Sequence, residues 1–339
     1  MDWNFIFFAL VKILAVIFLA VLPMVAYSVL VERRVSAWIQ DRIGPNRVGP
    51  FGLFQPMSDI LKLFLKEDFT PLSVRKVYFW LAPAITLIPA FMTVAVIPFG
   101  STLGSQKMVI ADLNVGILYT FGIVSLGVYG IVLAGYASNS KYPFLGGIRS
   151  SAQLISYELA MGLSAIPLFL IVGDLNLSQV IGYQAAHGWL VFFAPVSFAI
   201  FLVAAFAETN RLPFDLPESE QELVGGYHTE YSSMKFALYF LSEYANMIAS
   251  SAIMVTLFFG GWTLPVFGLD QPAASVGGGL LHIAIFVGKL LCFMLLFIWV
   301  RWMLPRFRYD QLMDLGWRRF IPLALANIVI TALILWLRA

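Results

Sequence analysis

Acidic side chains crowd one short segment of this chain. Residues 208–231 read ETNRLPFDLPESEQELVGGYHTEY and contain a single arginine, Arg211. The carboxylates belong to Glu208, Asp215, Glu218, Glu220, Glu222 and Glu230. Carboxylates this close shift one another's ionisation and titrate as a group, which suits a store of protons. The alternative interpretation is an acidic loop that water solvates.

Further ionisable side chains lie inside long apolar runs. Glu158 occurs in QLISYELAMG and Glu243 in YFLSEYANMI. A carboxyl group at such depth is neutral, paired with a base or facing a hydrated cavity, and ionisable groups there usually serve proton or ion pathways. The alternative for Glu158 and Glu243 is a structural salt bridge, for example with Arg149 or Lys235. Lys289 is also deep in an apolar run, where it could pair with an acid on a neighbouring span.

Composition places these residues in a membrane. Of the 339 residues, 60% are hydrophobic and only 12% are charged, whereas soluble domains average about 25% charged residues. Apolar runs of about 20 residues predict helices, because barrel strands would alternate over about 10. We expect an all-α polytopic protein, with residues 1–339 forming a single integral membrane domain. The predicted eight transmembrane helices are 5–31, 77–99, 113–136, 153–172, 190–207, 234–261, 280–304 and 320–337.

Basic residues predict the orientation of these spans. Nearly all lysines and arginines outside the spans fall in the odd-numbered connections, and the even-numbered ones carry only Lys107. Basic loops face the cytoplasm. We therefore expect the N-terminus and the C-terminus on the periplasmic side. The predicted cytoplasmic loops are about 32–76, 137–152, 208–233 and 305–319.

The first of these loops contains a predicted amphipathic surface helix. Met57, Ile60, Leu61 and Phe64 recur at the spacing of one helix face. Such a helix rests on lipid headgroups, or it roofs a cavity between the membrane and a soluble partner. The segment before it is rich in arginine, which serves either orientation in the membrane or docking onto an acidic or polar partner surface.

The sequence offers few ligands for a redox cofactor. Of three histidines only His282 is in a predicted span, so paired axial haem ligands are not expected. The single cysteine, Cys292, permits neither an iron–sulfur centre nor a disulfide within the chain. No nucleotide-binding glycine pattern and no metal-site spacing occurs. Any flavin, haem, iron–sulfur centre or metal is therefore expected to belong to another subunit.

Two long motifs resemble a known family. ERRVSAWIQDRIGPNRVGPFGLFQPMSDILKLFLKE spans residues 32–67, and the acidic segment 208–231 is followed by LSEYANMI from Leu241. The chain resembles the H subunit (subunit 1 in mitochondria) of proton-translocating NADH–quinone oxidoreductase, respiratory complex I. The resemblance covers essentially the whole chain, with mild departures at Ser219 and Phe54. It implies a heel subunit that joins the membrane arm to the hydrophilic arm and forms most of a quinone tunnel.

The resemblance also implies roles for individual residues. Those lining the tunnel entrance and the partner contact would be Arg33, Arg34, Trp38, Gln40, Arg42, Phe54 and Asp59. Those on the acidic path from the quinone cavity into the membrane would be Glu158, Glu208, Glu218, Glu220, Glu222 and Glu243. Glu32 and Glu230 are weaker candidates near this path. Quinone reduction would be coupled to proton translocation along the buried carboxylates.

The same resemblance sets the expected partners and location. Partners would be the hydrophilic quinone-site subunits, iron–sulfur subunits, adjacent small membrane subunits and membrane lipid, with no nucleic acid. The expected location is the bacterial cytoplasmic (inner) membrane rather than the mitochondrial inner membrane. One alternative is the equivalent subunit of a membrane-bound hydrogenase or of a quinone reductase with another donor. A stand-alone proton-coupled transporter is a further alternative, which the absence of internal repeats disfavours.

Overall fold

Helices make up most of the structure. The computed structural model describes residues 3–104, 106–216, 223–265, 269–273 and 275–338. Within these residues the regular strands are β1 (Thr102–Leu103) and β2 (Gln106–Lys107), which pair antiparallel with Thr102 opposite Lys107. The expectation of an all-α protein is therefore confirmed apart from this ribbon of two short strands.

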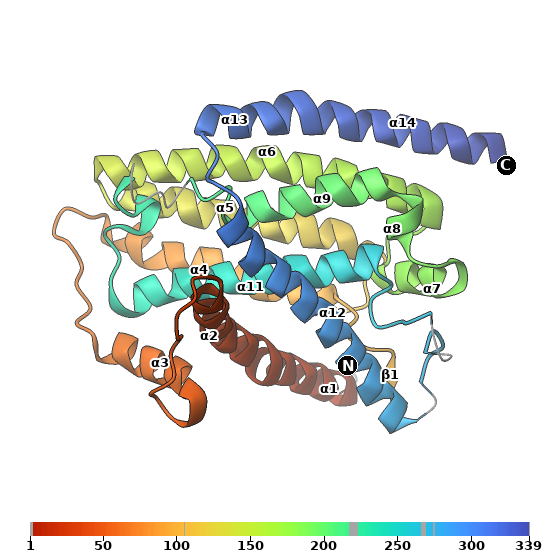
Figure 1. Cartoon of the computed structure of the whole chain (residues 1–339), viewed down its shortest axis with the longest axis horizontal. Coiled ribbons are helices and arrows are strands. Elements are labelled where there is room, and N and C mark those ends of the chain that lie inside the picture. Colours follow the sequence, from red (N-terminus) through yellow and green to blue (C-terminus); the bar gives the residue numbers. More distant parts are fainter. Residues whose placement is uncertain (1–2, 105, 217–222, 266–268, 274, 339) are drawn as a thin grey trace.

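A bundle of neighbouring helices forms the centre of the molecule (Figure 1). Its members are α4 (Lys76–Thr93), α5 (Gly116–Ala137), α6 (Lys141–Val172), α9 (Pro195–Glu208) and α11 (Ser233–Phe258). Buried apolar side chains fill the space between them. α4 contains Pro83 and Pro89, which remove backbone donors. The hydroxyls of Thr86 and Thr93 donate to backbone carbonyls of the same helix there.

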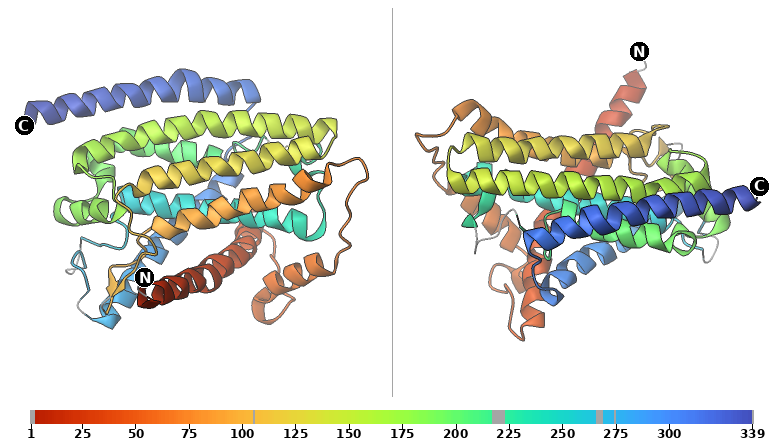
Figure 2. Two further views of the ribbon diagram at one scale, coloured as in Figure 1. Left: turned by 180° about the vertical axis from the view of Figure 1, so that it is seen from behind. Right: turned by 90° about the horizontal axis from the view of Figure 1, so that it is seen from above.

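Further helices surround this bundle. α1 (Trp3–Ala15), the π-helical segment η1 (Val16–Val21) and α2 (Leu22–Ile39) follow one another as a single tilted rod, and α12 (Val276–Met303) crosses the bundle obliquely (Figures 1 and 2). α13 (Tyr309–Asp314), the π-helical segment η5 (Leu315–Phe320) and α14 (Ile321–Arg338) run beside α6. Among the described residues, the other helical segments are η2 (Pro50–Gly52), α3 (Gln55–Leu65), η3 (Val94–Val96), α7 (Leu177–His187), α8 (Leu190–Phe193) and η4 (Gly226–His228).

A pair of hydrogen bonds clasps α6 to the segment before α14. The hydroxyl of Tyr157 donates to the carbonyl of Leu312 at 2.9 Å, and Trp317 Nε1 donates to Ser156 Oγ at 2.8 Å. Gly316 is buried beside the Tyr157 ring. These contacts involve the two residues of α6 directly before Glu158.

Helix length and composition support a multi-pass membrane protein. Among the described residues, six helical stretches are long and apolar enough to cross a membrane: Phe7–Ile39, Lys76–Val96, Gly116–Ala137, Lys141–Val172, Val276–Met303 and Tyr309–Arg338. α9 is apolar but has only 14 residues, about 21 Å, which is shorter than the roughly 30 Å hydrocarbon layer. α11 has 26 residues but contains Lys235 and Glu243. The count of eight spans and the sides of the termini therefore stay predictions.

The predicted loop boundaries differ from the structure in places. The segment 137–152 is helical from Lys141 onwards, and helix resumes at Tyr309 within the predicted loop 305–319. The polar start of α6 remains helical because protein packs against it: a Cβ on Gly146 would lie 2.8 Å from Gly226 Cα. The segment 190–207 is divided into α8 and α9, with Pro195 at the start of α9.

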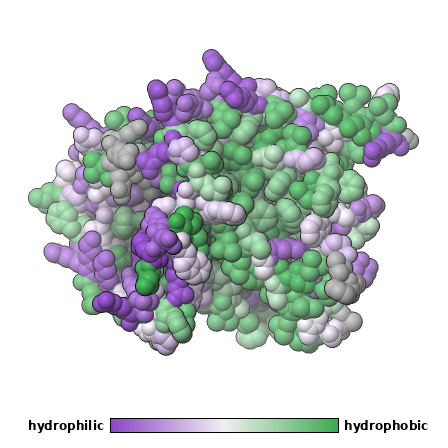
Figure 3. All heavy atoms as spheres, viewed as in Figure 1, coloured by the Kyte–Doolittle hydropathy of each residue, from purple (hydrophilic) through white to green (hydrophobic). Residues whose placement is uncertain are grey.

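Polar groups gather toward one end of the bundle. Figure 3 shows hydrophilic side chains mainly at the end that carries α3 and the starts of α6 and α13, with apolar side chains over the middle of this face. Both termini lie toward the other end in Figure 1. The predicted amphipathic helix corresponds to α3, whose face with Met57, Ile60, Leu61 and Phe64 is exposed.

We expect Gly130→Ala to destabilise the bundle by at least about 2 kcal/mol, because overpacking a filled interface strains both helices. The new Cβ would lie 2.7 Å from Thr86 N and 2.9 Å from Ala82 O across the α4–α5 interface. Thermal unfolding in detergent measures the change. Gly122→Ala on the same helix is the matched control, because open space surrounds that position. Equal unfolding temperatures for the two variants would contradict close packing at Gly130.

Candidate functional site: a buried ion cluster beside a carboxylate-lined cavity

A buried arginine is the centre of the site. Arg211 is 5% exposed, and its Nη1 donates to Glu32 at 3.1 Å (Oε1) and 3.0 Å (Oε2). Arg211 Nε forms an ion pair with Glu243 Oε1 at 2.8 Å. The Tyr244 ring packs 4.4 Å from the guanidinium carbon, and its hydroxyl donates to Glu32 at 2.7 Å. Arg301 also pairs with Glu32 through Nη1. We refer to these five residues as the Arg211 cluster.

The Arg211 cluster joins parts of the chain that are far apart in sequence. It takes carboxylates from α2 and α11, a guanidinium from α12, and Arg211 from the turn after α9. Asn210 adopts a left-handed conformation with φ of 50°, which asparagine tolerates better than most residues. The amide of Arg211 donates to the Phe206 carbonyl at 3.3 Å, and Phe214 N donates to the Arg211 carbonyl at 2.8 Å. The turn therefore holds the Arg211 side chain toward the bundle.

Charge balance explains why the Arg211 cluster is stable. Burial opposes the charge on Arg211, but the carboxylates of Glu243 and Glu32 outweigh burial and hold the pKa of Arg211 well above its usual value. Glu32 is shared by Arg211 and Arg301. Removing one member would leave a charge without compensation in a buried setting, which destabilises by about 3–5 kcal/mol.

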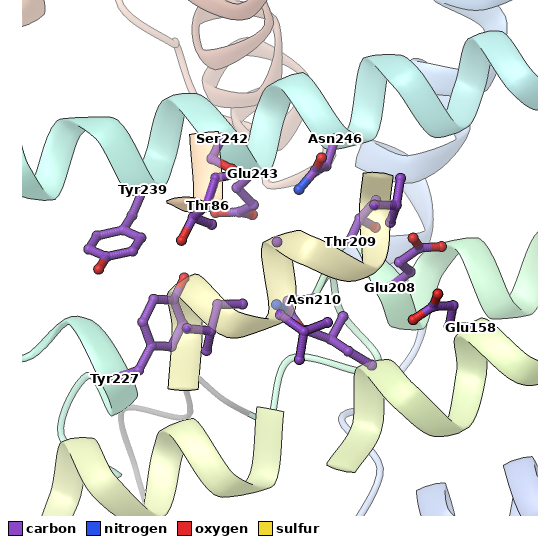
Figure 4. A pocket seen from close by; sticks show the side chains of 15 residues that line it. Thr86, Glu158, Glu208, Thr209, Asn210, Tyr227, Tyr239, Ser242, Glu243 and Asn246 are labelled. Carbon is purple, nitrogen blue, oxygen red and sulfur yellow. Dashed lines mark hydrogen bonds between the residues drawn. The ribbon is translucent and has the colours of Figure 1, made fainter. Parts of the chain in front are cut away.

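A small cavity lies beside the Arg211 cluster. In Figure 4 the carboxylates of Glu158 and Glu208 point toward one another at one end of this cavity, and Glu243 and Asn246 come from α11. The centres of water molecules can occupy a volume of about 40 Å³ in this cavity. A buried water needs roughly 10–15 Å³ by this measure, so the cavity is large enough for a few waters.

Buried polar atoms face this cavity. Glu208 Oε2 and the hydroxyl of Tyr239 are buried without a hydrogen-bond partner among the described residues. Buried polar groups normally have partners, and water in a polar cavity is one source of them. The cavity therefore suits a short hydrated path between the carboxylates.

Glu243 belongs both to the Arg211 cluster and to the lining of the cavity. It lines the cavity and forms the ion pair with Arg211. A second, smaller space of about 10 Å³ shares Glu208 and Asn246 with the first and adds Thr120 and Ser250. Ionisable and polar groups thus continue from the Arg211 cluster through the cavity toward the interior of the bundle.

The remainder of the acidic segment is described only in part. Glu218, Glu220 and Glu222 lie outside the described residues. Asp215 pairs with Arg306 at 2.9 Å, and burial raises the pKa of Asp215 although the guanidinium opposes this change. Burial among aromatic rings lowers the pKa of His228 to about 4. Glu230 is half-buried after η4.

The residues predicted at the tunnel entrance form a separate, surface group. Arg33 pairs with Asp59 at 2.7 Å, and Arg42 Nε donates to Gln40 Oε1 at 2.7 Å. Trp38 is 70% exposed. Phe54 is exposed before α3, and Arg34 is half-buried on α2. The structure therefore brings Glu158, Glu208 and Glu243 together and places the predicted tunnel residues at the α2–α3 surface.

In the described part of the chain neither Glu158 nor Glu243 pairs with Arg149 or Lys235, and Glu243 forms its salt bridge with Arg211. Arg149 lies over the Tyr309 ring, and Lys235 pairs with Asp68 at 3.1 Å. Helix periodicity does not reveal these tertiary contacts.

Lys289 pairs with main-chain carbonyls in place of an acid. Its Nζ donates to the carbonyls of Phe259 at 2.6 Å, Gly261 at 3.0 Å and Thr263 at 2.6 Å. These carbonyls follow the end of α11, where helical partners run out. The lysine therefore holds together the turn that follows α11.

Part of the Arg211 cluster is not evident from sequence patterns. Sequence patterns make Glu32 only a weaker candidate for the acidic path, and Arg301 contributes only to the predicted orientation of the chain in the membrane. Arg211 carries a usable signal, since it is the single arginine among the carboxylates of residues 208–231. Its partners on α2 and α12 carry no such signal, because their proximity depends on the packed fold.

We expect Arg211→Met to destabilise the protein by about 3–5 kcal/mol, because Glu32 and Glu243 would lose their shared buried partner. The thermal unfolding temperature of the purified protein measures this loss. Arg308→Met is the matched control: Arg308 pairs with Asp310 at the surface, and surface pairs contribute about 0–1 kcal/mol. Similar unfolding temperatures for both variants would show that the Arg211 cluster does not stabilise the fold.

Comparisons with known proteins all identify the same family. The sequence pattern of the NADH dehydrogenase family matches residues 11–332. The NADH-quinone oxidoreductase H subunit 1 of Cytophaga hutchinsonii is 50% identical over 326 residues, which is 94% of each chain. The NADH-quinone oxidoreductase H subunit of Flavobacterium psychrophilum is 50% identical over 345 aligned positions, covering 99% of each chain. Because these matches extend over nearly the whole length, the chain belongs to the H-subunit family of NADH–quinone oxidoreductase, respiratory complex I.

Proposed function

We propose that this chain is the membrane-arm heel subunit that couples quinone reduction to proton translocation through its buried carboxylates. The observation that carries the proposal is the double role of Glu243, which pairs with Arg211 and also lines the cavity of Glu158 and Glu208. A change in charge at the Arg211 cluster is therefore felt directly at the cavity. The names of the relatives supply the reaction to which the coupling belongs.

The quinone would approach from the end that carries α3. The apolar face of α3 is exposed, with Leu61 60% and Phe64 63% accessible. Exposed apolar patches of this kind mark binding surfaces. Together with the predicted residues from Arg33 to Asp59, this face would form the tunnel entrance and the contact with the hydrophilic subunits. The alternative of a helix resting on lipid is compatible with the same face.

Proton movement would follow from the shared pairing of Arg211. Quinone reduction takes up two protons with two electrons, and the carboxyl groups that supply those protons are left negatively charged, which changes the charge near the Arg211 cluster. If Glu243 gains a proton, Arg211 keeps only Glu32 as a charged partner in the cluster. Glu243 can then exchange protons with the cavity, where the like charges of Glu208 and Glu158 oppose one another. The carboxylates would thus respond in sequence to a single event at the quinone.

The partners and location follow from the same proposal. Flavin and iron–sulfur centres would be held by the hydrophilic subunits, and small membrane subunits would adjoin this chain. The protein would reside in the cytoplasmic membrane of a bacterium, with the odd-numbered loops in the cytoplasm.

We expect Glu158→Gln to lower NADH-driven quinone turnover and proton pumping by about 10-fold while the complex still assembles. The amide preserves shape but cannot carry the proton. Glu67→Gln is the matched control, because Glu67 is exposed beyond α3. Proton pumping in membrane vesicles and assembly on native gels are the measurements. Wild-type pumping in the Glu158 variant would remove this residue from the path.

We expect Arg42→Ala to raise the KM for quinone or to weaken docking of the hydrophilic arm, because the guanidinium that contacts Gln40 at the entrance would be lost. Lys141→Ala removes an exposed charge at the start of α6 and serves as the control. Steady-state kinetics and native gels separate the two effects. An unchanged KM together with full assembly would contradict a role at the entrance.

A further inference from the structure

One buried amide holds both ends of the turn that carries Glu208 and Arg211. Gln153 on α6 is fully buried. Its Nε2 donates to the Ala207 carbonyl at 2.7 Å and to the Phe214 carbonyl at 2.8 Å. An amide nitrogen has two hydrogens, and these two carbonyls share them with the more distant Asn210 Oδ1 at 3.3 Å. The turn between the two carbonyls, residues 208–213, is thereby fixed to α6.

Two residues of this turn serve different parts of the site. Glu208 directly follows Ala207 and faces the cavity, whereas Arg211 in the middle of the turn pairs with Glu32 and Glu243. Glu158 lies on α6, five residues after Gln153. One side chain therefore sets the relative position of α6, the cavity carboxylate and the Arg211 cluster.

The amide nitrogen of Gln153, which is the hydrogen-bond donor, determines this arrangement. Gln153 Oε1 is buried without a hydrogen-bond partner among the described residues. Exchanging the oxygen and nitrogen positions would direct the oxygen at two carbonyl oxygens, which only accept hydrogen bonds. The side chain is thus held by its nitrogen, and a replacement without donors could not hold the turn.

We propose that Gln153 is a positioning residue that sets Glu208 against Glu158 and Arg211 against Glu32 and Glu243. The inference rests on the proposed function of these carboxylates in proton translocation. It adds a residue that carries no transferable proton at working pH. Gln153 controls the path through geometry.

Gln184 offers a matched comparison within the chain. It is 2% exposed, its Nε2 donates to the Thr256 carbonyl at 2.9 Å, and its Oε1 accepts from Leu190 N at 3.1 Å and Gly260 N at 2.9 Å. Like Gln153, it joins separate segments by buried hydrogen bonds. Its partners are backbone groups near the end of α11, away from the paired carboxylates. Gln184→Met therefore removes similar bonds without moving the site.

The test compares Gln153→Met and Gln184→Met in the intact complex. Methionine keeps the length of the side chain but has no donor. We expect both variants to unfold at lower temperature. Only Gln153→Met should also lower proton pumping, by about 10-fold, since misplacement by about 1 Å at a reacting geometry can cost on the order of 100-fold. Only this variant should shift the midpoint of the pH–rate profile of turnover, by about half a unit or more.

Further variants keep the test decisive. If Gln153→Met does not assemble, Gln153→Asn retains the donors with a shorter reach and should shift the pH profile in an assembled complex. A wild-type pH profile in the assembled Gln153 variant would overturn the inference. Glu208→Gln separates the two levels: if it lowers pumping while the Gln153 variant behaves like Gln184→Met, only the positioning role fails. If Glu208→Gln pumps normally, the carboxylate path fails, and the positioning role fails with it.

Discussion

An arginine withdrawn from water must have its charge compensated, and the chain meets this requirement at Arg211 by joining α2, α11 and the turn after α9. The same requirement draws in α12, because Glu32 is shared between Arg211 and Arg301. Buried ion pairs add little net stability compared with apolar packing, but they specify partners strictly once formed. The relative placement of these helices is thus set by charge as much as by apolar contact.

The need to compensate the charge of Arg211 also connects the Arg211 cluster with the carboxylate-lined cavity. Glu243 cannot change its charge without changing the balance around Arg211, and it cannot leave the cavity while α11 stays packed on α4. The surface group around Arg33 and Asp59 is built differently, from exposed side chains on α2 and α3. Partner subunits would complete that surface, whereas the buried part is already complete within one chain.

Features that depend on local pattern are predictable from the sequence. The apolar face of α3 follows from the spacing of Met57 to Phe64, and the depth of Glu158 follows from the run around it. Features that depend on packing are not predictable in this way. The link from Glu32 to Arg211 spans 179 positions, and Lys289 binds carbonyls that any sequence could provide. The extent of α6 is underestimated because hydropathy locates the membrane layer, and protein contacts keep the polar turns before it helical.

The clasp between α6 and the segment before α14 ties the C-terminal helix to the part of α6 that carries Glu158. Tyr157 donates to the Leu312 carbonyl, and Ser156 accepts a hydrogen bond from Trp317. Ser156 and Tyr157 directly precede Glu158 in α6. α14 extends 18 residues beyond this point, about 27 Å, with most of its surface exposed. α14 packs along α6 and α9 over this length, and Asn327 Nδ2 donates to Ser197 Oγ at 2.9 Å. A shift of α6 at the carboxylate pair would therefore carry α14 with it and reach the exposed face of α14, where a neighbouring subunit could respond to it.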